Sequence, residues 1–162
     1  MLSLVCFTAP APARAAQLTP WTGDAPPELS LKDLSGTQHD LAQYRGKVVL
    51  LNFWATWCEP CRAEMPSMER LRKRYADAPF VVLAVNVDEP EQRIRAFLKR
   101  VPLGFTVLAD PGMRVTRAWN ARVLPASFLI GRDGRIRYSA RGDLDWSSDA
   151  VARLVGDLLE AR

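Results

Sequence analysis

The sequence predicts one α/β domain in three layers, with helices on both faces of a mixed β-sheet. Two nearly continuous apolar runs, residues 47–54 (KVVLLNFW) and 80–87 (FVVLAVNV), are typical of strands buried on both faces. Apolar residues at helical spacing in 58–75 predict a helix between them, and a crossover of this length joins parallel strands. Alternation of apolar and polar residues in 28–41, on both sides of Ser35-Gly36, predicts a hairpin. A second hairpin is predicted at 126–140, where ASFLI and IRYSA flank the turn GRDGR, and the two hairpins add antiparallel strands.

Length and composition are those of one ordinary globular domain. The chain has 162 residues, of which 48% are hydrophobic and 25% charged. The formal charge is +4, but the basic residues are scattered among acids, so we expect no nucleic-acid partner. A weak attraction to acidic partners or anionic lipid headgroups stays open. A monomer is expected.

Residues 1–15 differ from the rest of the chain and predict a signal peptide. An apolar run precedes Ala13-Arg14-Ala15, which matches a cleavage site after Ala15. The usual basic start is missing, so the alternatives are a start further upstream and a segment that is retained. We therefore expect an exported, periplasmic protein, tethered to the membrane if the segment stays. Cleavage removes Cys6 and leaves Cys58 and Cys61, for which export favours a disulfide.

The remaining chain divides into a short lead-in and one domain. Residues 16–27 are rich in proline and predict an extended lead-in with no element of its own, and 28–162 form the domain. A second helix is expected after Pro90, and apolar residues at helical spacing in 151–159 predict a closing helix.

The CxxC pair of Cys58 and Cys61 has three interpretations. A structural zinc site needs four ligands, and the chain offers this pair and one histidine, His39, which we expect to be a solvated turn residue. The same lone histidine disfavours a copper carrier. We therefore expect no metal and no other cofactor. A purely structural disulfide would close too short a loop to add much stability.

Redox chemistry is the third interpretation, and the position of the pair favours it. Cys58 follows a buried strand and opens a helix, where free N–H groups and the helix dipole favour a thiolate. Cys61 lies one turn further in. We expect Cys58 to be the exposed nucleophile and Cys61 the buried resolving thiol of a two-step thiol-disulfide exchange.

These residues resemble a known family. NFWATWCEPC (52–61) looks like the active site of the thioredoxin-like fold, and the following EMP, LAVNVDEPEQRIRAFLKR and LPASFLIGRDGRI resemble the TlpA/ResA group of exported thiol-disulfide oxidoreductases. The resemblance implies a thioredoxin-like α/β/α sandwich with an N-terminal β-hairpin, a βα insertion and a cis peptide before Pro125. It also implies substrate contacts, with the Leu124 backbone pairing with an incoming peptide. The substrate-contact candidates are Trp57, Glu59, Pro60, Leu124 and Pro125.

Glu64 is the candidate proton acceptor and donor. Thioredoxins carry a buried aspartate where this chain has Asn52, and Glu64 lies three residues after Cys61, on the same helix face. Similar members of the group carry an acid there. The alternative is a solvated surface glutamate.

The resulting hypothesis is a low-potential reductant of protein disulfides. Glu59 places a negative charge beside Cys58, which disfavours the stabilised thiolate of a strong oxidant. By resemblance, the substrate would be the oxidised haem-binding cysteine pair of an apocytochrome c, and the electron donor a membrane thiol transporter. The alternatives are a thioredoxin-fold peroxidase, although Leu51 and Ala55 replace the proline and threonine of the peroxidase pattern, and a copper-binding carrier that uses the CxxC pair.

Overall fold

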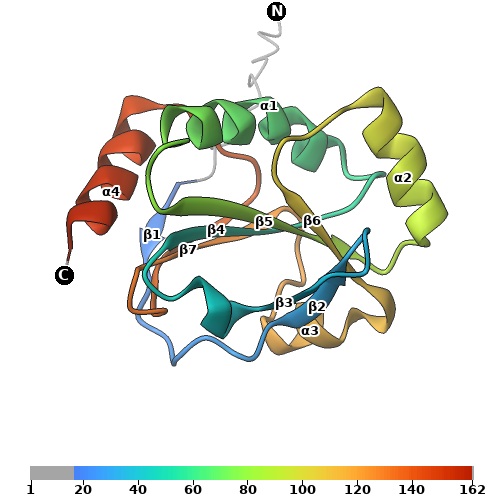
Figure 1. The fold of residues 1–162 in the computed structure, drawn as a ribbon, viewed down its shortest axis with the longest axis horizontal. Coiled ribbons are helices and arrows are strands. Elements are labelled where there is room, and N and C mark those ends of the chain that lie inside the picture. The colour runs from blue at the N-terminus through green and yellow to red at the C-terminus, as the bar shows by residue number, and fades with distance from the viewer. Residues whose placement is uncertain (1–16, 162) are drawn as a thin grey trace, which may run out of the picture.

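The computed structural model describes residues 17–161 and has the three-layer α/β architecture that the sequence predicts (Figure 1). Across the described residues, eight strands form one sheet in the order β1-β8-β7-β4-β5-β6-β2-β3. The strands are β1 Thr19–Pro20, β2 Ser30–Asp33, β3 Gln38–Asp40, β4 Val48–Trp54, β5 Phe80–Val87, β6 Thr106–Asp110, β7 Ala126–Ile130 and β8 Ile136–Arg141. The helices are η1 Leu41–Tyr44, α1 Glu59–Arg74, α2 Glu91–Arg100, η2 Pro111–Met113, α3 Arg114–Ala118 and α4 Asp149–Glu160.

Strand β4 is the centre of the sheet and leads directly into the cysteines. It pairs with β5 in parallel and with β7 in antiparallel fashion. Alternate side chains of a strand point to opposite faces, so Leu50 and Trp54 enter one apolar cluster and Leu51 and Phe53 the other. Both clusters are covered by helices, which explains why all seven residues of β4 are buried and why its sequence is almost continuously apolar.

The two faces of the sheet are covered unequally. Helices α1, α2 and α4 pack on one face, and α3 lies on the other (Figure 1). Between β5 and β7 the chain adds α2, β6 and α3, and β6 pairs in parallel with β5. The predicted hairpins β2–β3 and β7–β8 are both present.

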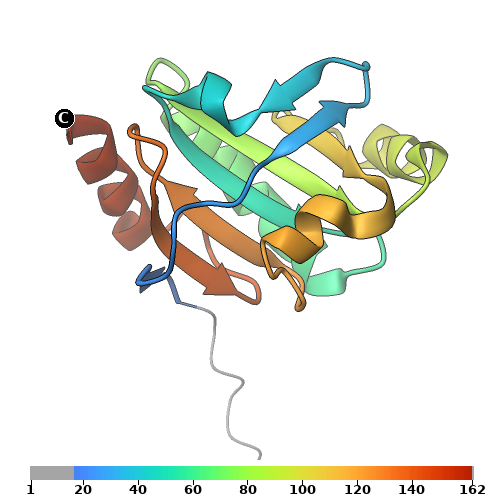
Figure 2. The same cartoon turned by 90° about the horizontal axis from the view of Figure 1, so that it is seen from below.

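The lead-in is more structured than the sequence suggests. The prediction that it carries no element is wrong at β1, which pairs with the edge of β8. The chain then crosses the face of the sheet that carries α3 (Figure 2). The Trp21 ring packs edge-on against Phe128, with centroids 5.8 Å apart, and this anchor accounts for the ordered path of a proline-rich segment.

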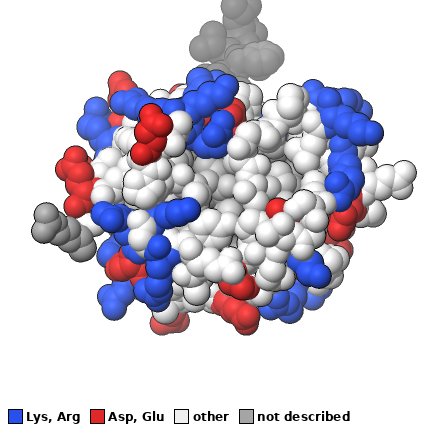
Figure 3. All heavy atoms as spheres, in the orientation of Figure 1, with Lys and Arg blue, Asp and Glu red and all other residues white. Residues whose placement is uncertain are grey.

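The surface carries no single basic patch on the face that Figure 3 shows. Lysine and arginine side chains are spread around its rim and alternate with acids. None of the helices within residues 17–161 is long and apolar enough to cross a membrane. The predicted signal peptide, residues 1–15, lies outside the described residues.

Candidate active site

The cysteine pair lies at the N-terminus of α1, as the sequence predicts. Cys58 is the N-cap residue, and it forms a disulfide with Cys61, with 2.04 Å between the sulfurs. The Cys61 backbone N–H donates to Cys58 Sγ at 3.3 Å, so a helix N-terminal donor points at this sulfur. That arrangement favours negative charge on Cys58. In this oxidised state Cys58 is only 5% exposed and Cys61 1%, so the predicted nucleophile is less exposed than the sequence suggests.

The neighbours of the pair divide into a buried side and an open side. Trp57 is 66% exposed, and Glu59 and Pro60 in the first turn of α1 are exposed as well. Trp54, in contrast, is fully buried against Phe97. Helix α1 continues through Pro66 to Arg74, so the proline does not end it.

The Leu124-Pro125 peptide is cis, as the family resemblance implies. Phe53 pairs with Ala126 across β4 and β7, and because these strands are antiparallel, Pro125 lies at the end of β4 that leads to the cysteines. Leu124 and Trp57 line the same cavity. The structure therefore brings together the segments that carry Trp57, Leu124 and Pro125.

Glu64 is buried, which contradicts the alternative of a solvated surface residue. It is 3% exposed and lies three residues after Cys61 on the buried face of α1. Its Oε1 accepts a hydrogen bond from Asn52 Nδ2 at 2.7 Å, and its Oε2 accepts from the Trp146 indole N–H at 2.9 Å and from the Leu144 backbone N–H at 3.2 Å. Burial raises the pKa of Glu64 to about 7, and the three hydrogen bonds counter only part of that rise.

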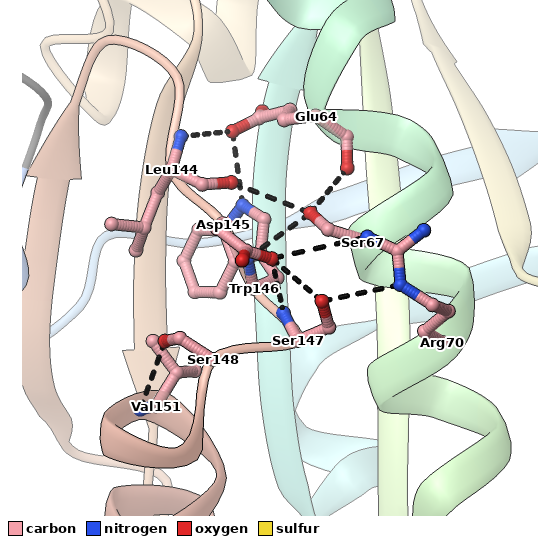
Figure 4. A network of polar contacts seen from close by, with 9 residues as sticks. All are labelled: Glu64, Ser67, Arg70, Leu144, Asp145, Trp146, Ser147, Ser148 and Val151. Atoms are coloured by element: carbon pink, nitrogen blue, oxygen red, sulfur yellow. Dashed lines mark hydrogen bonds and ion pairs between the residues drawn. The ribbon is translucent and has the colours of Figure 1, made fainter.

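A polar network holds the loop between β8 and α4, residues 142–148, over Glu64 (Figure 4). Ser67, one turn further along α1, accepts the Trp146 backbone N–H at 3.0 Å and donates to the Glu64 carbonyl at 2.7 Å. Arg70 donates to Ser147 Oγ at 3.2 Å. The covering loop is thereby held to α1, and Glu64 stays enclosed while its carboxylate remains bonded to neutral donors only.

A second buried carboxylate, which the sequence analysis missed, holds the turn before Cys58. Glu89, just after β5, accepts the Thr56 backbone N–H at 2.6 Å and the Thr56 hydroxyl at 2.5 Å. It also accepts from Asn86 Nδ2 at 2.8 Å. In the sequence Glu89 stands in a run of polar residues, so only its position after a buried strand end could have singled it out.

The expectation about His39 is wrong. It lies on β3, half-buried, with Nδ1 2.6 Å from the Tyr44 hydroxyl and Nε2 3.1 Å from Asp33 Oδ2. The histidine therefore joins the β2–β3 hairpin to η1. No group of three or more His, Cys, Asp or Glu side chains that could hold a metal ion occurs within residues 17–161.

Comparison with known proteins gives consistent matches. Residues 22–139 match the AhpC/TSA family. The chain is 41% identical over 122 residues to the thiol-disulfide oxidoreductase ResA of Geobacillus kaustophilus (strain HTA426), covering 75% of this chain and 70% of that protein.

Solved structures agree. A candidate thiol:disulfide interchange protein DsbE from Chlorobium tepidum has a TM-score of 0.78 and 34% identity, over 88% of this chain and 99% of that chain. The exposed lipoprotein thioredoxin Etrx1 of Streptococcus pneumoniae strain TIGR4 has a TM-score of 0.71 and 26% identity, over 82% of this chain and all (100%) of that chain. The fold is thus thioredoxin-like, as the sequence resemblance implies.

Proposed function

The chain belongs to the AhpC/TSA family and is a thiol-disulfide oxidoreductase similar to ResA, and on that premise we propose that it is an exported, low-potential reductant of protein disulfides. The observation that carries the proposal is the Cys58–Cys61 pair at the N-terminus of α1, with the buried Glu64 on the same helix face. Export is supported by the description of Etrx1 as an exposed lipoprotein.

The reaction consists of two thiol-disulfide exchanges. In the reduced protein, the Cys58 thiolate attacks one sulfur of a target disulfide, forms a mixed disulfide and releases the other target sulfur as a thiolate. Cys61, once deprotonated, attacks Cys58 Sγ, which releases the second target thiolate and forms the Cys58–Cys61 disulfide. The target gains two electrons and the protein loses two. A membrane dithiol donor then reduces Cys58–Cys61 by the same exchange.

Glu64 is the proton carrier in this scheme. Deprotonation of Cys61 needs an acceptor in a buried place, and a carboxylate with a pKa of about 7 can both take and return a proton near neutral pH. Its negative form, together with the exposed Glu59 next to Cys58, disfavours a persistent thiolate. Both charges favour a reductant over a strong oxidant.

The most specific part of the proposal concerns the substrate and the electron donor. The substrate is the oxidised haem-binding cysteine pair of an apocytochrome c and the donor is a membrane thiol transporter, as in cytochrome c maturation. The similarity to ResA-type proteins supports this choice. Reduction of a disulfide-bonded CxxCH peptide, compared with a peptide that lacks the histidine, tests it.

The function is tested by trapping. We expect Cys61→Ser to accumulate a mixed disulfide with target proteins through Cys58, since no resolving thiol remains. Cys58→Ser is the matched control and should trap nothing. Equal trapping by both variants would contradict the assigned roles. Rapid consumption of hydrogen peroxide without disulfide reduction would instead support the peroxidase alternative, with which the AhpC/TSA match is compatible.

A further inference from the structure

A cavity of about 540 Å³ lies beside the disulfide-bearing turn. Trp57, directly before Cys58, forms one side, and Leu124, directly before the cis proline, forms another. The lining residues are Trp57, Val87, Met113, Thr116, Arg117, Ala121, Arg122 and Leu124. Because Trp57 directly precedes Cys58, the cavity adjoins the place that a target disulfide has to reach. Its volume is sufficient for a side chain of the target.

Most of this lining is apolar, and its charged members are both arginines. Arg117 lies in the last turn of α3 and Arg122 in the segment before the cis peptide, and both are exposed. Within residues 17–161 neither of them forms an ion pair, whereas Arg70, Arg72 and Arg74 on α1 each contact an acid.

Four acids lie close to the cavity, and within residues 17–161 none of them forms an ion pair with either arginine. Glu59 is exposed two residues after Trp57, and Asp110 accepts the Thr116 hydroxyl at 2.7 Å. Asp88 follows the lining residue Val87, and its Oδ1 accepts the Gly112 backbone N–H at 2.7 Å. Glu89 is buried and directed to Thr56. Two guanidinium groups beside an apolar cavity are suited to a target that carries an apolar side chain and a carboxylate, because a guanidinium pairs with a carboxylate in a bidentate, planar geometry.

We infer that Arg117 and Arg122 make this cavity select disulfide targets that carry an acidic residue and an apolar residue next to the attacked cysteine. This inference rests on the proposed reductase function and names the class of target. Opposite charge speeds the encounter, and a basic flank is disfavoured by repulsion from both arginines. The thiol-disulfide exchange itself is unchanged.

The test compares two peptides with an identical disulfide and an apolar neighbour, one with glutamates and one with lysines beside the cysteine. For the native chain reduced by dithiothreitol, we expect kcat/KM to be on the order of tenfold higher for the acidic peptide at low ionic strength, and the ratio to shrink as salt is added. The double variant Arg117→Glu/Arg122→Glu should reverse the preference. Arg153→Glu, an exposed arginine on α4, is the matched control and should keep it.

The outcomes separate the two proposals. Equal rates for both peptides, or a preference that Arg153→Glu removes as effectively as the double variant, would overturn the inference and leave the reductase function standing. Failure of the native chain to reduce either peptide would overturn both. If the double variant does not fold, as judged by circular dichroism, the salt dependence of the native chain's preference decides: a ratio that does not change with salt contradicts the inference.

Discussion

Glu64 and Glu89 are both buried carboxylates, but one lies on the helix that Cys58 opens and the other bonds to the turn that leads to Cys58. Glu64, on α1, meets only neutral donors from Asn52, Leu144 and Trp146. Glu89, after β5, bonds twice to Thr56, and the Arg93 guanidinium lies 3.8 Å from it. The comparison shows that burial alone does not define a carboxylate's role. A carboxylate without a cation is suited to exchange a proton, and one bonded to the backbone of a turn is suited to hold it.

The largest effect is expected from Glu64→Gln on turnover. The glutamine side chain keeps the shape of the glutamate. Its hydrogen bonds are kept when the Asn52 amide flips, because Asn52 Oδ1 then accepts from the glutamine NH2 group and from the Ser127 hydroxyl. Because the proposed proton carrier is lost, reductase turnover at neutral pH should fall by about a hundredfold or more. The titration of the cysteine thiols should shift downward, since a nearby negative charge is gone.

Steady-state reduction of insulin and thiol alkylation against pH measure these two effects. Glu69→Gln is a suitable control, because this α1 glutamate pairs with Arg72 and lies eight residues, more than two helical turns, beyond Cys61. If Glu64→Gln matches the parent in both measurements, Glu64 is a structural residue like Glu89, and the contrast between the two carboxylates disappears.

The stability of the oxidised protein should depend on pH through Glu64. Its pKa is about 7 in the folded protein and near its usual 4.5 in the unfolded chain, so between these values the folded state holds a proton that the unfolded state has lost. This contribution to stability is fully present below pH 4.5, and it is lost as pH rises to about 7. It amounts to on the order of 3 kcal/mol for a group this buried.

Urea unfolding of the parent and Glu64→Gln at several pH values checks this. The difference between their free energies of unfolding should shift in favour of the variant as pH rises from 4.5 to 7, and should level off above. Other groups cancel in that difference, among them Asp33, whose pKa is held low by the Ser35 hydroxyl. Parallel pH profiles would show that Glu64 titrates in the folded protein as it does in water.

The sequence predicts those parts of the site that depend on residues close together in the chain, and it misses contacts between residues far apart in the chain. The sequence predicts Cys58 and Cys61 because a strand end and a helix start are local patterns, and it predicts Glu64 from its helical spacing to Cys61 together with the family resemblance. The partners of Glu64 were not predicted, because Trp146 and Leu144 lie 82 and 80 residues away and reach it only through packing of the loop before α4. Strand β1 was likewise not located from residue patterns, because an edge strand of two residues carries little periodic signal.

The smallest effect is expected from Thr56→Val, which removes the hydroxyl bond to Glu89 and keeps the backbone bond and the side-chain shape. A hydrogen bond to a carboxylate at a half-buried residue contributes about 1 to 2 kcal/mol, so the free energy of unfolding should fall by that amount. The matched control is Thr116→Val, because the Thr116 hydroxyl also donates to a buried carboxylate, Asp110 Oδ2, at 2.7 Å. Both variants should lose similar stability in urea unfolding.

Only Thr56→Val loosens the turn that sets Cys58 against the helix N-terminus, and it should therefore raise the pKa of the Cys58 thiol, as followed by iodoacetamide alkylation of the reduced protein. An alkylation profile of Thr56→Val that overlays those of Thr116→Val and the parent would mean that Glu89 stabilises the fold without positioning the nucleophile.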